Sequence, residues 1–204
     1  MALPNRHLLG LSAIAILLAC GPSQDSRGAR PYFDLGGATT GSGHFFDFPF
    51  PSDLRLDPDG TPNMDGYPAN ARGGLFNPLV ALAGSRRGFS TMPVSYFRFS
   101  EALSPRSVEV VLAPSTDAEV LLVDIDPTST SRGALYPTVT STLANDEAWS
   151  PGHILAVAPY PGVVLAPSRS YAIVVTTDVR AEDGRPVERA GAIEMMSRNK
   201  QPSG

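Results

Sequence analysis

The stretch Val94–Ser100 (VSYFRFS) decides the fold, because its apolar and polar side chains alternate in the manner of a β-strand. Phe97 and Phe99 share one face of this strand, whereas Tyr96 and Arg98 share the other. Successive side chains of a strand point to opposite faces. We therefore expect Phe97 and Phe99 to pack in a core and Arg98 to face water.

Short segments rich in β-branched residues follow at intervals, and turn residues separate them. Strands are expected within Val108–Ala113, Glu119–Ile125, Leu135–Leu143, Ile154–Ala158 and Tyr171–Thr177. The pair Asp183-Gly184 then predicts a tight hairpin. Six or seven short strands within about 100 residues are typical of an immunoglobulin-like β-sandwich. The sequence therefore predicts an all-β protein with an Ig-like sandwich over residues 93–190, although the Cys-Trp-Cys pattern of antibody domains is absent.

The segment before the sandwich, residues 44–92, is dense in turn-forming residues. The whole chain holds 19 glycines and 20 prolines, which suits a β-rich protein with many turns. One short helix is predicted near residues 77–83, because Asn77 can cap it, Pro78 suits its first position and Gly84 can end it. This segment is therefore expected to be extended and turn-rich, with a single helix.

The only cysteine of the chain, Cys20, directly follows an apolar run. The run Leu8–Ala19 comes after Arg6, and at about a dozen residues it is shorter than the roughly 20 that span a bilayer. This pattern is typical of a signal peptide, here residues 1–19. The closing stretch Leu17–Gly21 (LLACG) resembles the lipobox of bacterial lipoproteins, which implies lipidation of Cys20. An ordinary secretory signal is the alternative interpretation.

Acyl chains on Cys20 would hold the mature protein in the bacterial cell envelope. Each buried methylene contributes about 0.8 kcal/mol, and stable anchoring generally takes two acyl signals. The aspartate that often retains lipoproteins at the inner membrane directly follows the cysteine, and here Gly21 occupies that position. The same resemblance therefore implies the outer membrane, on its periplasmic face or at the cell surface. Residues 20–43 are rich in small and polar residues and are predicted to form a flexible tether.

Five short motifs carry a second resemblance. They are Phe48–Leu54 (FPFPSDL), Asp59–Thr61 (DGT), Gly88–Thr91 (GFST), Val94–Ser107 (VSYFRFSEALSPRS) and Ala166–Gly184 (APSRSYAIVVTTDVRAEDG). The last two look like the hallmark strands of bacterial Ig-like domains. In this order, the five resemble the N-terminal domain of bacterial virulence-factor lipases, over roughly residues 45–190. The resemblance implies an Ig-like fold followed by a catalytic α/β-hydrolase domain, which this sequence does not contain.

No residue is predicted to be catalytic, and the chain is not expected to be an enzyme. A serine hydrolase of that class needs a G-x-S-x-G turn. The nearest run, Gly41–Gly43, lies in the predicted tether. Neither His44 nor His153 has neighbours that indicate a general base. P-loop and G-x-G-x-x-G patterns are also absent, so no nucleotide cofactor is expected.

Carboxylates are the remaining candidates for a metal site. Four of them lie in the turn-rich segment: Asp53, Asp57, Asp59 and Asp65. Their spacing does not fit a calcium-binding EF-hand loop, and Asp and Gly are the residues that turns prefer. We therefore predict turns and no metal. At a strand end, Asp124 and Asp126 flank Ile125, and one is expected at the surface and the other in a turn.

Aromatic residues are candidates for binding. Four phenylalanines stand within six residues: Phe45, Phe46, Phe48 and Phe50. They can pack against the sandwich in extended form, or they can form an exposed groove for acyl chains or a partner. The interleaved prolines keep the segment extended and favour packing. Trp149 is a further candidate anchor for a ligand.

Two functions remain open. The first is a non-catalytic, lipid-anchored envelope protein whose Ig-like domain serves as a binding or spacer module, with a protein or glycan partner that the sequence does not identify. The second is the truncated N-terminal part of a secreted lipase or esterase, because the polar tail of residues 191–204 lacks a finishing strand. The formal net charge of −4 argues against a nucleic-acid partner.

Overall fold

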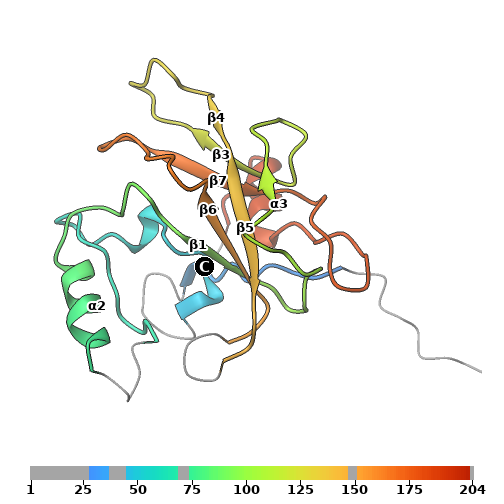
Figure 1. Cartoon of the computed structure of the whole chain (residues 1–204), viewed down its shortest axis with the longest axis horizontal. Coiled ribbons are helices and arrows are strands. Elements are labelled where there is room, and N and C mark those ends of the chain that lie inside the picture. The colour runs from blue at the N-terminus through green and yellow to red at the C-terminus, as the bar shows by residue number, and fades with distance from the viewer. Residues whose placement is uncertain (1–27, 37–44, 69–73, 147–150, 203–204) are drawn as a thin grey trace, which may run out of the picture.

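Most of the regular structure lies in two antiparallel β-sheets (Figure 1). The computed structural model describes residues 28–36, 45–68, 74–146 and 151–202. One sheet has the strand order β1-β6-β5-β2 and the other β4-β3-β7. The strands are β1 Ser95–Arg98, β2 Val111–Leu112, β3 Val120–Asp124, β4 Leu135–Tyr136, β5 Thr138–Leu143, β6 Ile154–Pro159 and β7 Tyr171–Val175. The predicted all-β class is confirmed.

The helices in the described part of the chain are short. They include the 3-10 helices η1 Phe45–Asp47 and η2 Asp53–Arg55, and the α-helices α2 Phe76–Gly84 and α3 Gly191–Ser197. The predicted helix 77–83 is present as α2, although Leu75 rather than Asn77 is its N-cap. Pro78 fits because it lies in the first turn, where backbone N–H groups have no partner within the helix. α3 lies inside the predicted polar tail.

A buried core lies between the two sheets. It contains Phe99 from the end of β1, Val120 from β3, and Leu155 and Val157 from β6, and Phe97 packs against it. Burying a large apolar side chain contributes about 1.5–3 kcal/mol, so these residues hold the sheets together. The expected inward face of the first strand, with Phe97 and Phe99, is confirmed.

The opposite face of β1 is covered as well. The ring of Tyr96 packs edge-on against Phe46, with 5.4 Å between the centroids. Arg98 forms an ion pair with Asp47, and its guanidinium lies 4.5 Å from the centre of the Tyr32 ring. Its side chain is only 17% exposed. The prediction that Arg98 faces water is therefore wrong, because the N-terminal segments fold over this face.

Residues 28–36 belong to the domain. The N–H of Tyr32 donates to the carbonyl of Arg98 at 2.9 Å, and Ala29 is fully buried in the core between the sheets. The predicted tether, residues 20–43, is therefore wrong for this part of the chain. Its other residues, together with Cys20 and the predicted signal peptide, lie outside the described residues.

The phenylalanine-rich segment packs against the domain. Phe45, Phe46 and Phe48 are buried, and the first two form a second apolar cluster with Ile154 of β6. The packing interpretation is confirmed, although η1 makes a turn of 3-10 helix where an extended chain was expected. This segment consequently lies beside β1, and Phe48 and Pro49 line a cleft there.

Candidate binding cleft

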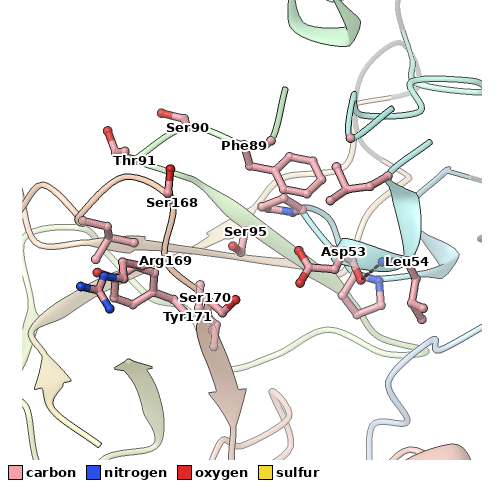
Figure 2. Close-up of a pocket in the computed structure, with 18 of the residues that line it drawn as sticks. Asp53, Leu54, Phe89, Ser90, Thr91, Ser95, Ser168, Arg169, Ser170 and Tyr171 are labelled. Atoms are coloured by element: carbon pink, nitrogen blue, oxygen red, sulfur yellow. Dashed lines mark hydrogen bonds between the residues drawn. The ribbon is translucent and has the colours of Figure 1, made fainter. Parts of the chain in front are cut away.

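A half-open cleft of about 930 Å³ lies beside the sheet edges (Figure 2). The outer strands β1 and β7 of the two sheets contribute to it, and the turn-rich N-terminal segment and the loop before β7 complete it. Its apolar lining includes Phe33, Phe48, Phe89, Phe97, Leu165 and Ile173. Ligand clefts measure roughly 300–1,000 Å³ and combine apolar walls with a few polar groups. The size and lining of this cleft suit a ligand.

Ser95 contributes the most buried polar side chain of the cleft. It is the first residue of β1 and shares the inward face of this strand with Phe97. The residue is 5% exposed, and its hydroxyl forms no hydrogen bond within the described part of the protein. The described side-chain atoms that are both buried and without a hydrogen-bond partner lie elsewhere, on Arg55, Arg98, Arg106 and Thr138. The hydroxyl of Ser95 can therefore bond to a polar group that enters the cleft.

Asp53 faces the cleft from the first position of η2. Ser52 caps this short helix, because its hydroxyl oxygen accepts the N–H of Leu54 at 3.4 Å. In Figure 2 the carboxylate of Asp53 points toward Ser95. It is exposed and has no hydrogen bond or ion pair in the described part of the chain. Asp53 therefore supplies a free acceptor beside the Ser95 hydroxyl.

The neighbouring aspartates serve the turns. The carboxylate of Asp59 accepts the N–H and the hydroxyl of Thr61 at 3.0 and 2.6 Å, and these bonds hold the pKa of Asp59 below its usual value. Asp57 accepts a hydrogen bond from the amide of Asn63 at 3.4 Å. The turn interpretation is confirmed for these two residues. The described residues contain no group of three or more His, Cys, Asp or Glu side chains arranged for a metal.

Asp126 fixes the loop that forms one rim of the cleft. Its carboxylate accepts the hydroxyl and N–H of Thr128 at 2.7 and 2.8 Å and the N–H of Ser170 at 3.2 Å, and Arg169 lies 3.4 Å away. The bonds from Thr128, followed by that from Ser170 and the charge of Arg169, lower the pKa of Asp126 to about 2.

The expected surface position of one member of the pair Asp124 and Asp126 is wrong, because both are buried. The carboxylate of Asp124 accepts the N–H of Asp126 at 2.9 Å and the hydroxyl of Ser129 at 2.6 Å. The two carboxylates are therefore satisfied by hydrogen bonds within this turn. Their role is structural: they hold the loop at residues 168–170 against the end of β3.

His153, a further candidate from the sequence, does not line the cleft. His153 is exposed, and its carbonyl accepts the N–H of Phe99 at 2.9 Å. His44 and Trp149 lie outside the described residues, as does Cys20. Neither histidine nor cysteine is among the described residues that line the cleft, and the carboxylate in its lining is that of Asp53.

The motifs that carry the resemblance to the lipase N-terminal domain gather around this cleft. Much of the lining comes from residues 48–49 and 51–54, Gly60, residues 88–91 and residues 166–171, although more than 100 positions separate the first motif from the last. The sequence interpretation missed Ser95. Its signal was available, because the period of two places this polar residue on the same face as Phe97 and Phe99.

Comparisons with protein-family models, with curated proteins and with solved structures found no match for this chain. Within the described residues, none of the helices has the length and apolar character needed to cross a membrane.

Proposed function

We propose that this protein is a non-catalytic, lipid-anchored component of the bacterial cell envelope. Its two-sheet domain is an Ig-like β-sandwich that binds a partner. The observation that carries the binding function is the cleft, where, among the described residues, the hydroxyl of Ser95 forms no hydrogen bond and the carboxylate of Asp53 has no partner. A spacer needs no such cleft, so the binding function is the better supported of the two.

The proposed anchor is the set of acyl chains on Cys20, at the outer membrane. Eight residues, 20–27, lead from Cys20 to the first described residue, Gly28. An extended chain spans at most about 3.6 Å per residue, so these residues reach roughly 30 Å. The domain would therefore stay close to the membrane surface and bind partners there.

Metabolic labelling with palmitate tests the anchor. The wild-type chain is expected to take up label and to fractionate with membranes, whereas Cys20→Ala loses both properties. Ser197→Ala, a change at an exposed serine of α3, is the control and keeps both. Equal labelling of the wild type and Cys20→Ala would refute the lipid anchor.

The second candidate function is the N-terminal part of a lipase or esterase, with the catalytic domain encoded downstream. The observation that favours it is the gathering of the lipase-like motifs around one cleft. Reading the genomic DNA beyond codon 204 tests this candidate. An in-frame continuation that encodes a G-x-S-x-G turn supports it, and an intergenic region rejects it.

A further inference from the structure

The outer edge of β7 carries unpaired backbone groups. β7 pairs only with β3 among the described strands, and it ends the three-stranded sheet. The N–H of Thr176 donates to Glu119 at 2.9 Å, and the carbonyl of Ser170 accepts Ile125 at 3.0 Å, so the even-numbered residues face β3. Backbone groups alternate in direction along an antiparallel strand. Three residues therefore turn N–H and C=O outward, without a backbone partner in the described chain: Tyr171, Ile173 and Val175.

This edge also lacks the usual protection. Natural edge strands carry charged residues, prolines or bulges that prevent pairing with another chain. β7, with the sequence YAIVV, contains no charged residue and no proline, and Val174 is 42% exposed. β1, the outer strand of the other sheet, is different, because Phe50 and Pro31 form backbone bridges along it. An unprotected five-residue edge is a template for an additional strand.

The open edge and the cleft coincide. Tyr171 and Ile173 line the cleft together with Ser95 of β1. Figure 2 shows Ser95 between Asp53 on one side and the segment from Ser168 to Tyr171 on the other. A single hollow thus presents the outward backbone groups of β7 and a serine hydroxyl that forms no hydrogen bond within the described residues.

We propose that an extended strand of a partner protein binds in this cleft and pairs with β7 as the fourth strand of its sheet. This inference rests on the proposed binding function and names the class of ligand. A polypeptide backbone offers donors and acceptors at the spacing of the outward groups of β7, which is the basis of recognition by strand addition. A glycan has no such ladder.

The geometry also defines the side chains of the partner strand. Paired residues of neighbouring strands share a face of the sheet. Residues opposite Ile173 will point toward Phe97 and the core, so they are expected to be apolar. One polar residue in the same row will reach the hydroxyl of Ser95. The intervening residues will lie beside Val174 on the outer face of the sheet, where polar side chains also fit.

Selection from a phage-displayed library of ten-residue peptides, on the purified full-length chain in detergent micelles, provides the probe. An enriched peptide is then added to the ¹⁵N-labelled chain, and amide hydrogen exchange is followed by NMR. The amides of Tyr171 and Ile173 are expected to exchange at least tenfold more slowly with peptide. Those of Ala172 and Val174, already bonded to β3, will change little. This alternation is specific to an added strand.

Two matched variants test the part played by the cleft. Ser95→Ala removes the hydroxyl and should raise the dissociation constant of the peptide about five- to tenfold, as the loss of one hydrogen bond predicts. Thr138→Val removes a hydroxyl that is buried and without a partner in the described chain, on β5 and outside the cleft lining, and should leave peptide affinity unchanged. Equal affinity of both variants would overturn the inference.

The remaining outcomes separate this inference from the proposed function. The absence of any enriched peptide, or peptides that leave exchange at Tyr171 and Ile173 unchanged, would overturn strand addition. If a panel of soluble oligosaccharides binds instead, and Ser95→Ala weakens that binding, the binding function stands and the polypeptide ligand is wrong. A concentration-dependent dimer that protects the same two amides would identify a second copy as the occupant, which also overturns a partner protein.

Discussion

Arg98 connects three separate parts of the chain. It projects from β1, forms an ion pair with Asp47 of η1, and stacks on the ring of Tyr32. The pair is largely removed from water, so solvent screens it less than it screens a surface ion pair. A cation over an aromatic ring adds about 0.5–2 kcal/mol. One side chain thus ties the N-terminal segments to the first sheet.

Arg98→Ala is therefore expected to lower the free energy of unfolding by about 1–3 kcal/mol, because it removes the stacking and leaves the carboxylate of Asp47 without this cation. Urea denaturation of the full-length chain measures the loss. Arg132→Ala, at an exposed turn residue, is the control and should change stability by less than about 0.5 kcal/mol. If both variants are equally stable, the contacts of Arg98 contribute nothing.

Asp126 predicts a dependence of stability on pH. Its pKa is about 2 in the folded chain, below the value of about 3.9 expected when unfolded. The ionised form is thus favoured by folding, and its contribution is complete above about pH 4 and is lost as the pH falls toward 2. Asp126→Asn should flatten this part of the profile of urea midpoint against pH. The exposed Asp117→Asn should preserve it, and identical profiles for the two variants would contradict the assignment.

At the scale of elements, the apolar pattern identified the strands, and β1, β2, β3, β6 and β7 contribute side chains to the core between the sheets. The exception is the predicted strand Leu135–Leu143, which divides at Pro137 into β4 and β5. β4 pairs with β3 in one sheet and β5 with β6 in the other. Proline lacks the N–H that a continuous ladder needs, so the chain changes sheets there. The local pattern of apolar and polar residues does not indicate which of the two sheets a strand joins.

For a related reason, the sequence did not predict that residues 28–36 pack into the domain. Their composition is that of a linker, and their contacts are mainly backbone hydrogen bonds to distant residues, such as the bond from the N–H of Ser100 to Arg30 at 2.8 Å. Backbone bonds of this kind leave little signature in side-chain type. The fully buried Ala29 is small and common in linkers, so it gave no signal either.

Phe99→Ala tests the core at the end of β1. Phe99 is almost fully buried between the sheets, so the change should cost about 3–5 kcal/mol out of a total stability of about 5–15 kcal/mol. The urea midpoint should fall accordingly. Val164→Ala, at an exposed apolar residue, should change stability by less than about 0.5 kcal/mol. A small effect of Phe99→Ala would show that this ring is not part of the core.

At the scale of the whole molecule, the cleft exists only because distant segments meet. The turn-rich segment supplies Asp53, β1 supplies Ser95, and the loop before β7 supplies Ser168 and Arg169. The sequence showed several of these motifs one by one, but their meeting depends on how the N-terminal segment packs on β1. The site was therefore predictable in its parts and not in its arrangement.

The arrangement of the cleft predicts that the purified chain hydrolyses no ester. Ser95, Ser168 and Ser170 line it, yet none of the described residues of the lining is a histidine, the usual general base that activates a serine nucleophile. Hydrolysis of p-nitrophenyl butyrate by the wild type should equal that of Ser95→Ala and of buffer. The second candidate function gives the same expectation, because its chemistry would belong to a separate domain. Activity that persists through purification, is blocked by a serine-directed phosphonate and disappears in Ser95→Ala would make the cleft an active site.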